Sequence, residues 1–118
     1  MTPSRPDPRE VLPLSPPVYH VLLALGDQAA HGYAIMQTFE RLTEGREQLL
    51  PGTLYATLAR MVETGLIEET APGAPDADRR RRYYRVTPWG RAVAAAEGER
   101  MRLLLEVAAA RGMAPEGA

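Results

Sequence analysis

The sequence predicts a mainly α-helical protein with one small β-hairpin, arranged as three short helices, the hairpin and a longer fourth helix. Three observations lead to this expectation. Apolar residues recur at helical spacing in four segments, glycine or proline separates these segments, and one aromatic, β-branched stretch follows the third of them. A length of 118 residues with 45% hydrophobic residues suits one compact core.

The N-terminal segment, residues 1–14, is rich in proline, and we expect a flexible arm with at most a short turn around residues 8–12. A first helix follows this arm. Ser15 is a good N-cap, and the two prolines after it fit a first helical turn, where their missing N–H groups are harmless. Apolar residues then recur at helical spacing until Gly26, which predicts the end of this helix.

Two further helices are predicted between residues 31 and 65. One begins at His31-Gly32 and ends near Gly45, and the next begins at Pro51 and ends at Gly65. In the latter helix, apolar residues at i, i+4, i+7 and i+8 give one buried stripe, so the opposite side should face solvent. This stripe consists of Leu54, Leu58, Met61 and Val62.

A β-hairpin is expected next along the chain. Residues 66–70 partly alternate between apolar and polar side chains, residues 71–78 have the proline and glycine content of a turn, and residues 82–87 are aromatic and β-branched. Because successive side chains of a strand point to opposite faces, we expect one of Tyr83 and Tyr84 to pack on the helices and the other to be exposed.

The last helix is predicted to begin with Thr87 as its N-cap and to run from Pro88 to about Arg111, just before Gly112. Its apolar residues are spaced roughly as heptads, and no element remains in the chain to cover them. We therefore expect this helix to pair with a copy of itself in a homodimer. The residues expected at that contact are Trp89, Val93, Ala96, Leu103, Leu104, Val107 and Ala108.

Three helices followed by a hairpin are the components of a winged helix-turn-helix domain. The sequence therefore divides into a flexible arm at 1–14, a winged helix-turn-helix domain at 15–87, a C-terminal dimerisation helix at 88–112 and a tail at 113–118. In such a domain a recognition helix, here the third, enters the major groove of DNA, where its N-terminal residues reach base edges.

Composition narrows the class of protein. The chain has no cysteine and only two histidines, without a cluster of ligands around them, so we expect no metal and no cofactor. We find no glycine-rich phosphate loop and no supported Ser/His/Asp set, so an enzyme is not expected. Because the sequence has neither an apolar run of membrane length nor a secretory leader, the expected compartment is the cytoplasm, without membrane contact.

The formal net charge is only −1, yet positive charge is concentrated locally. All 14 basic residues are arginine, and Arg79 to Arg82 are consecutive, with Arg85 close behind. A local positive patch attracts phosphates even on a neutral protein, and the guanidinium fork suits phosphate well. The alternative is a solvated loop in which these arginines pair with Asp76 and Asp78.

Three sequence motifs follow one another with a specific spacing between residues 14 and 93. They are His31-Gly32-Tyr33, then Pro51-Gly52-Thr53-Leu54-Tyr55 continuing through Leu58, Arg60 and Met61 to Gly65-Leu66-Ile67-Glu68, and finally Arg82-Tyr83-Tyr84-Arg85-Val86-Thr87 with Gly90-Arg91. In order and spacing these motifs resemble the PadR family of bacterial transcriptional regulators. The resemblance implies a winged-helix fold, sequence-specific operator binding, usually repression, and a homodimer built through the C-terminal helix. The single short helix here looks like the smaller branch of the family.

Candidate DNA contacts lie in three places. The start of the second helix offers free N–H groups to a phosphate, the exposed side of the third helix faces the major groove, and the arginine run lies at the tip of the wing. Helix capping is the alternative role for His31, and packing against Tyr33 is the alternative for Tyr55. The candidates are His31, Tyr33, Thr53, Tyr55, Ala56, Thr57, Arg60, Arg79, Arg80, Arg81 and Arg82.

The sequence therefore predicts a transcriptional repressor that binds a near-palindromic operator of double-stranded DNA as a homodimer. Trp89 either lines a dimer cavity for a small aromatic effector, as occurs in some relatives, or anchors the last helix to the wing. Two rival functions stay open. One is a winged-helix module that binds protein without binding DNA, and the other is a small-molecule sensor that uses the dimer cavity.

Overall fold

The structure is a computed structural model that describes residues 5–73, 75 and 78–117. Within these residues the chain forms four α-helices, one 3-10 helix and a small sheet. The elements in chain order are η1 (Pro8–Val11), α1 (Pro16–Leu25), β1 (Ala30–His31), α2 (Gly32–Leu42), α3 (Pro51–Thr64), β2 (Ile67–Thr70), β3 (Tyr83–Val86) and α4 (Pro88–Ala110).

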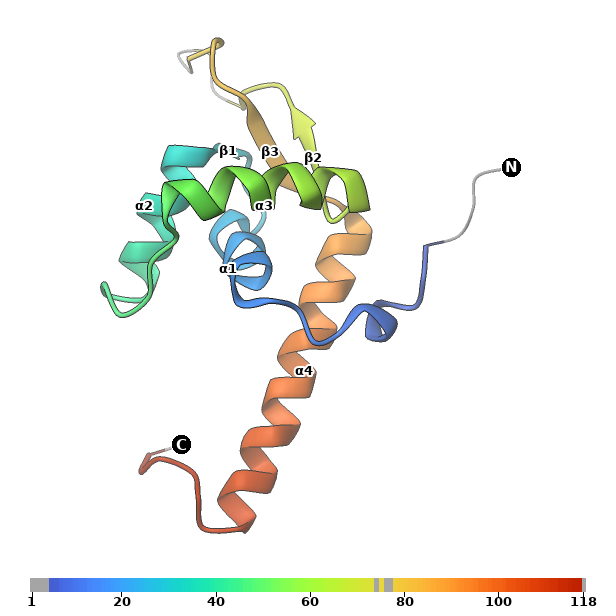
Figure 1. The fold of residues 1–118 in the computed structure, drawn as a ribbon, viewed down its shortest axis with the longest axis vertical. Helices are drawn as coiled ribbons and strands as arrows, with labels where there is room; N and C mark the ends of the chain where they lie inside the picture. The colour runs from blue at the N-terminus through green and yellow to red at the C-terminus, as the bar shows by residue number, and fades with distance from the viewer. Residues whose placement is uncertain (1–4, 74, 76–77, 118) are drawn as a thin grey trace.

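The arrangement of these elements is that of a winged helix with one long helix added. Figure 1 shows α3 crossing in front of α1, with β2 and β3 rising beyond it as the wing. The helix α4 follows β3 directly, packs against α1 and η1, and then projects with its C-terminal half away from the rest of the described chain (Figure 1). The predicted fold class, mainly α with a small β-hairpin, is confirmed.

The sheet has one strand more than the sequence predicted. Its order is β1-β3-β2, and both pairings are antiparallel. The predicted hairpin is formed by β2 and β3, with Ile67 opposite Val86, while Ala30 of β1 lies opposite Tyr84. The strand β1 has only two residues, too few for any periodicity to be recognised in the sequence.

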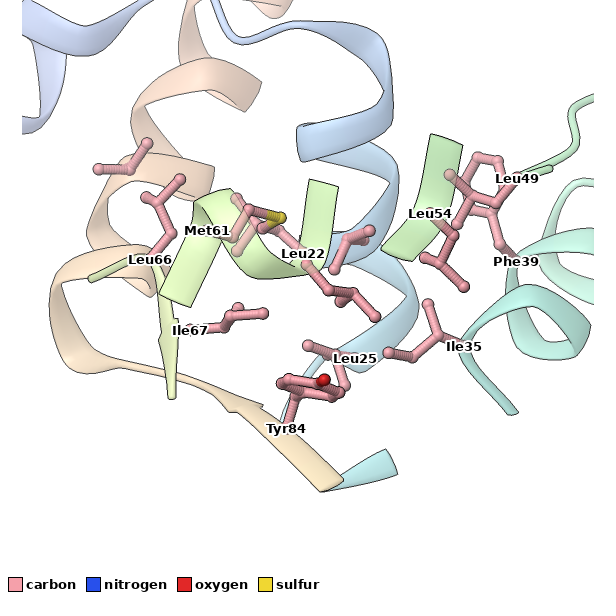
Figure 2. Close-up of a cluster of buried hydrophobic side chains, with 13 residues drawn as sticks. Leu22, Leu25, Ile35, Phe39, Leu49, Leu54, Met61, Leu66, Ile67 and Tyr84 are labelled. Atoms are coloured by element: carbon pink, nitrogen blue, oxygen red, sulfur yellow. The ribbon is translucent and has the colours of Figure 1, made fainter. Parts of the chain in front are cut away.

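The hydrophobic core lies between the three helices of the winged-helix part, the sheet and the first turns of α4. Figure 2 shows Leu22 and Leu25 of α1 at its centre, with Ile35 and Phe39 of α2 on one side. The predicted stripe of α3 points into this core, and its members Leu54, Leu58 and Met61 are all buried, whereas Val62 packs at the edge.

Both tyrosines of β3 are buried, so the expectation that one of them is exposed is wrong. Tyr83 and Tyr84 are each 8% exposed. Tyr84 joins the hydrophobic core, as expected for the helix-facing residue. Tyr83 is covered on the other face by His31, whose ring meets it edge-on with 5.4 Å between ring centroids. The unpredicted strand β1 brings this histidine into place.

The junction between the wing and α4 is fixed by Thr87 and Gly90. The Thr87 hydroxyl oxygen accepts the N–H of Gly90, as predicted for an N-cap, and the hydroxyl donates to the carbonyl of Gly65 at 2.6 Å. Gly90 lies so close to Leu66, the residue before β2, that a Cβ atom there would stand 2.0 Å from the Leu66 carbonyl oxygen. By contrast, Ser15 stands at the N-cap of α1 without a side-chain capping hydrogen bond.

The described part of the N-terminal segment, residues 5–14, packs against the rest of the chain, whereas its prolines led us to expect a flexible arm. The short turn around residues 8–12 takes the form of η1, whose N-cap is Asp7. This turn packs along α4, and Val11 and Leu12 lie against the hydrophobic core. Proline content alone indicated an extended chain, but two apolar side chains in this segment find a partner surface on α4.

Candidate nucleic-acid interface

The outer side of α3 is the first part of the candidate interface. Because the apolar stripe of this helix points into the core, its other side is presented to solvent, as the periodicity predicted. Pro51 and Gly52 open the helix, and its cap residue Leu50 makes no side-chain capping bond. Among the candidates on this side, Thr53, Tyr55, Ala56 and Arg60 are exposed and Thr57 is half-buried.

A groove of about 610 Å³ separates α3 from the wing and from the start of α2. Two tyrosines, one at each side, have their rings largely in solvent, with Tyr33 51% and Tyr55 56% exposed. The structure therefore brings together candidates that lie 50 residues apart in sequence. The lining residues are His31, Gly32, Tyr33, Tyr55, Ala59, Val62, Glu69, Arg81, Arg82 and Tyr84.

The ring of Tyr55 lies against the backbone of Gly32. A Cβ atom at position 32 would stand 3.0 Å from the Tyr55 ring, closer than nearly all such contacts. A glycine at the start of α2 therefore allows the tyrosine of α3 to approach. Packing of this kind fixes the ring while the hydroxyl end of a tyrosine stays available for a hydrogen bond.

His31 connects the start of α2 with the wing. Its Nδ1 accepts the N–H of Ala34 at 3.2 Å and lies 3.1 Å from Nη1 of Arg81. Since a guanidinium only donates, both contacts require Nδ1 to be an unprotonated acceptor. Burial, assisted by the positive charge of Arg81 and opposed by Asp78, lowers the pKa of His31. The capping role considered for this residue is therefore present.

The wing arginines are exposed and form ion pairs with nearby carboxylates. Arg80 and Arg81 both approach Asp78, with nitrogen–oxygen distances of 3.2 and 3.6 Å. Arg82 lies 3.5 Å from Glu69 across the hairpin. Hydrogen bonds from Arg80 hold the pKa of Asp78 below its usual value. Such exposed pairs contribute little to stability, so a phosphate can replace the carboxylate at small cost.

Arg81 is the wing arginine closest to the other candidates. Its guanidinium lies 6.0 Å from the centre of the Tyr33 ring, in addition to its contact with His31. Arg79 is exposed beside it. The alternative in which these arginines pair with acids of the loop is observed for Asp78, while Asp76 lies outside the described residues.

The C-terminal half of α4 presents a broad apolar surface. Within the described chain, no other element covers it in Figure 1. Leu103, Leu104 and Val107 are each more than half exposed, and Ala108 is partly buried. Met101 and Leu105 are exposed beside them. Exposed apolar surfaces of this kind are typical of sites that contact other molecules.

The predicted dimerisation residues on the first half of α4 contact the same chain instead. Val93 is 0% exposed and belongs to the hydrophobic core, so it is not available to a partner, and its assignment to the dimer contact is wrong. The heptad pattern could not reveal this, because core residues and the residues predicted for the dimer contact continue one stripe. Ala96 is half-buried. Trp89 packs on the core and donates its Nε1–H to the carbonyl of Pro6, consistent with an anchoring role.

Two polar residues that sequence reasoning missed are Glu97 and Arg5. Glu97 is completely buried on α4, and Arg5 lies over Trp89. No periodicity marks either of them, because Glu97 accepts from Leu14 and Arg5 donates to Thr64, both far away in sequence. Among the described residues there is no group of three His, Cys, Asp or Glu side chains that could hold a metal ion. No helix in the described part of the chain is long and apolar enough to cross a membrane.

The helices, the three-stranded sheet and the exposed side of α3 beside the wing define a winged helix-turn-helix protein. The model of the transcriptional regulator PadR-like family matches residues 21–96, well over half of the chain. The chain belongs to this family, which confirms the resemblance found in the three motifs. A comparison with curated proteins gives no match.

Solved structures support the same assignment. A transcriptional regulator from Clostridium thermocellum is 26% identical, with 77% of this chain and 84% of that chain covered and a TM-score of 0.65. A PadR-like transcription factor from Bacteroides fragilis is 26% identical over 76% of this chain and 84% of its own, with a TM-score of 0.60. The complex hsRosR-S4 is 25% identical over 90% of this chain and 97% of its own, with a TM-score of 0.63.

Proposed function

We propose that this protein is a repressor that binds a near-palindromic DNA operator as a homodimer. The observation that carries the proposal is the single surface formed by the outer side of α3, the start of α2 and the wing arginines. This surface joins hydrogen-bonding groups that suit base edges with guanidinium and phenol groups that suit phosphates. The family to which the chain belongs consists of transcriptional regulators.

Within this surface each group has a proposed role. Thr53, Ala56 and Thr57, near the start of α3, face base edges, while Arg60 binds a guanine or a phosphate. Tyr33 and Tyr55 donate their hydroxyls to the DNA backbone from the two sides of the groove. His31 caps α2 at the position that lies next to the DNA backbone.

The wing has the role of a phosphate clamp in this proposal. Arg79, Arg80, Arg81 and Arg82 follow one another, and the acidic partners of the last three are at least partly open to solvent. A phosphate carries a full charge and binds a guanidinium with two parallel hydrogen bonds, so it competes well with a single exposed carboxylate. Counterions released from the DNA add to the affinity at low salt.

The second copy of the chain binds through α4. The exposed apolar side chains Leu103, Leu104 and Val107 would be covered by the same surface of a partner, as a two-fold contact requires. Two recognition helices then face two half-sites about one helical turn apart, which makes the operator nearly palindromic. Occupation of a promoter by such a dimer excludes polymerase, which is the basis for proposing repression.

A small aromatic effector that relieves repression is also part of the proposal. Such a ligand acts only if it prefers one arrangement of the dimer to another. Trp89 is the only tryptophan in the chain, so its fluorescence would report a ligand that changes the surroundings of the start of α4. Titration with aromatic acids and phenols should both quench this fluorescence and weaken DNA binding. Quenching without any loss of DNA affinity would contradict a role of such a ligand as an effector.

The test of DNA binding is a fluorescence-anisotropy titration of the protein with the promoter DNA upstream of its own gene, at two salt concentrations and beside random duplex. Arg60→Ala should weaken specific binding by about tenfold, since a good side-chain contact to a base contributes about 1–3 kcal/mol. Arg9→Ala, which removes the same charge from an exposed side chain of η1, is the matched control. No binding to any duplex at low salt would favour the protein-binding module.

A further inference from the structure

The N-terminal segment 5–14, called the strap below, contacts both α3 and α4, the two helices whose relative position matters for DNA binding. We propose that the strap, through Arg5, holds the recognition helix α3 at a fixed angle to α4 and so sets the spacing of the two half-sites. This inference rests on the proposed function and goes beyond it, because it assigns a positioning role to a segment outside the matched family region, residues 21–96.

Arg5 closes the C-terminal end of α3. Its Nη1 donates to the carbonyl of Thr64, the last residue of α3, at 2.9 Å. A cation at this position also meets the negative end of the helix dipole. The guanidinium lies directly over Gly65, where a Cβ atom would stand 2.2 Å from Nη2. The glycine that ends the helix thus also leaves room for Arg5.

The same short segment holds the start of α4. The guanidinium carbon of Arg5 lies 5.4 Å from the centre of the Trp89 ring, within the range of a cation–π contact. Trp89 in turn donates its Nε1–H to the carbonyl of Pro6 at 2.9 Å. Two consecutive residues of the strap therefore connect the last residue of α3 with the second residue of α4.

The other end of the strap is fixed by a buried carboxylate. Glu97 on α4 is completely buried, and its Oε2 accepts the N–H of Leu14 at 2.5 Å. Its Oε1 pairs with Nε of Arg100. A buried carboxylate is costly unless all its partners are present, so the site on α4 is complete only with the strap in place. Between the two ends, η1 packs along α4.

A small change of angle at this junction has a large effect at the DNA. The 14 residues of α3 form a helix about 21 Å long, held by Arg5 at its C-terminal end while its N-terminal end is aimed at the bases. A rotation of about 5° at the held end moves the other end by about 2 Å, more than half of the 3.4 Å rise of one base pair. In a dimer both helices move, so the distance between half-sites is sensitive to the strap.

Spin-label distances in the full chain test the contact itself. The chain has no cysteine, so labels at Glu63→Cys on α3 and Ala95→Cys on α4 report the distance between these helices, with excess unlabelled protein added to leave only distances within one chain. Arg5→Ala should broaden this distance distribution. Arg9→Ala is the matched control, since Arg9 is exposed and pairs with Asp7 of its own turn. Equal distributions in the two variants would overturn the inference.

Binding to a series of palindromic duplexes, with half-sites moved apart by single base pairs, tests the consequence. The unaltered protein and Arg9→Ala should prefer one spacing, and in Arg5→Ala this preference should fall about five- to tenfold, as expected for loss of a helix-end contact and a cation–π contact together. An unchanged preference would overturn the positioning role. If the unaltered protein binds no duplex, the proposed function fails, while the spin-label distances still decide whether Arg5 holds α3 to α4.

Discussion

Replacing Gly90 with alanine should destabilise the protein strongly, although alanine is the better helix former. The added Cβ would stand 2.0 Å from the carbonyl oxygen of Leu66, 2.9 Å from its carbonyl carbon and 3.1 Å from Cγ1 of Val86. The first two atoms belong to the backbone and cannot rotate away, so α4 must move from β2. That movement also strains the hydrogen bonds through which Thr87 joins the two elements.

The expected cost is about 3 kcal/mol, the upper end of the range for overpacking a rigid site. For a domain of this size such a loss lowers the thermal midpoint by at least about 10 °C. Chemical and thermal unfolding followed by circular dichroism measure both quantities. The control lies in the same helix, because a Cβ at Gly98 would meet only the Tyr19 hydroxyl at an ordinary 3.5 Å.

Gly98→Ala should therefore stabilise the protein by up to about 1 kcal/mol, the difference in helix propensity between the two residues. The two variants differ only in what surrounds the new methyl group. If Gly90→Ala is as stable as the unaltered protein, α4 does not approach β2 as closely as described, and the account of the junction is wrong.

Three further predictions concern pH, assembly and salt. Burial, the largest cause at both sites, lowers the pKa of His20 and of His31. The free energy of unfolding should therefore be highest above the unfolded pKa of about 6.5 and should fall as the pH drops below it. In a double variant with glutamine at both positions, this free energy should change less between about pH 8 and pH 5.5. Leu104→Asp should shift sedimentation from dimer to monomer, whereas Ala95→Asp, also exposed on α4, should not; equal behaviour would place the dimer contact elsewhere. Arg81→Ala should weaken binding to all duplexes alike and reduce the salt slope by about one, and an unchanged slope would remove this residue from the phosphate contacts.

Much of the fold could be predicted because helices leave a strong periodic signal. The stripe Leu54, Leu58 and Met61 identified both the inside and the outside of α3, and thereby the exposed surface proposed to face DNA. Thr87 and the proline after it marked the start of α4 correctly. These features depend on neighbours within a few residues, which is the range over which a sequence can be interpreted directly.

The features that were missed depend on contacts between distant parts of the chain. The strand β1 forms where His31 pairs with Tyr83 of β3. The ring of His31 covers Tyr83, so this tyrosine is buried although strand alternation predicted one exposed ring. Val93 and Leu104 look alike in the heptad pattern, yet only the first has core residues opposite it. The hydrogen bond between Pro6 and Trp89 joins residues 83 positions apart, and no local pattern indicates it.

The most direct test of the central claim is a hydroxyl-radical footprint of the protein on a duplex selected for tight binding from a random pool. A homodimer with one α3 in each half-site should give two protected patches on one face of the DNA, symmetric about a centre and one helical turn apart. A single unsymmetrical patch would contradict the dimer, and a uniform pattern at every protein concentration would contradict specific recognition by this surface.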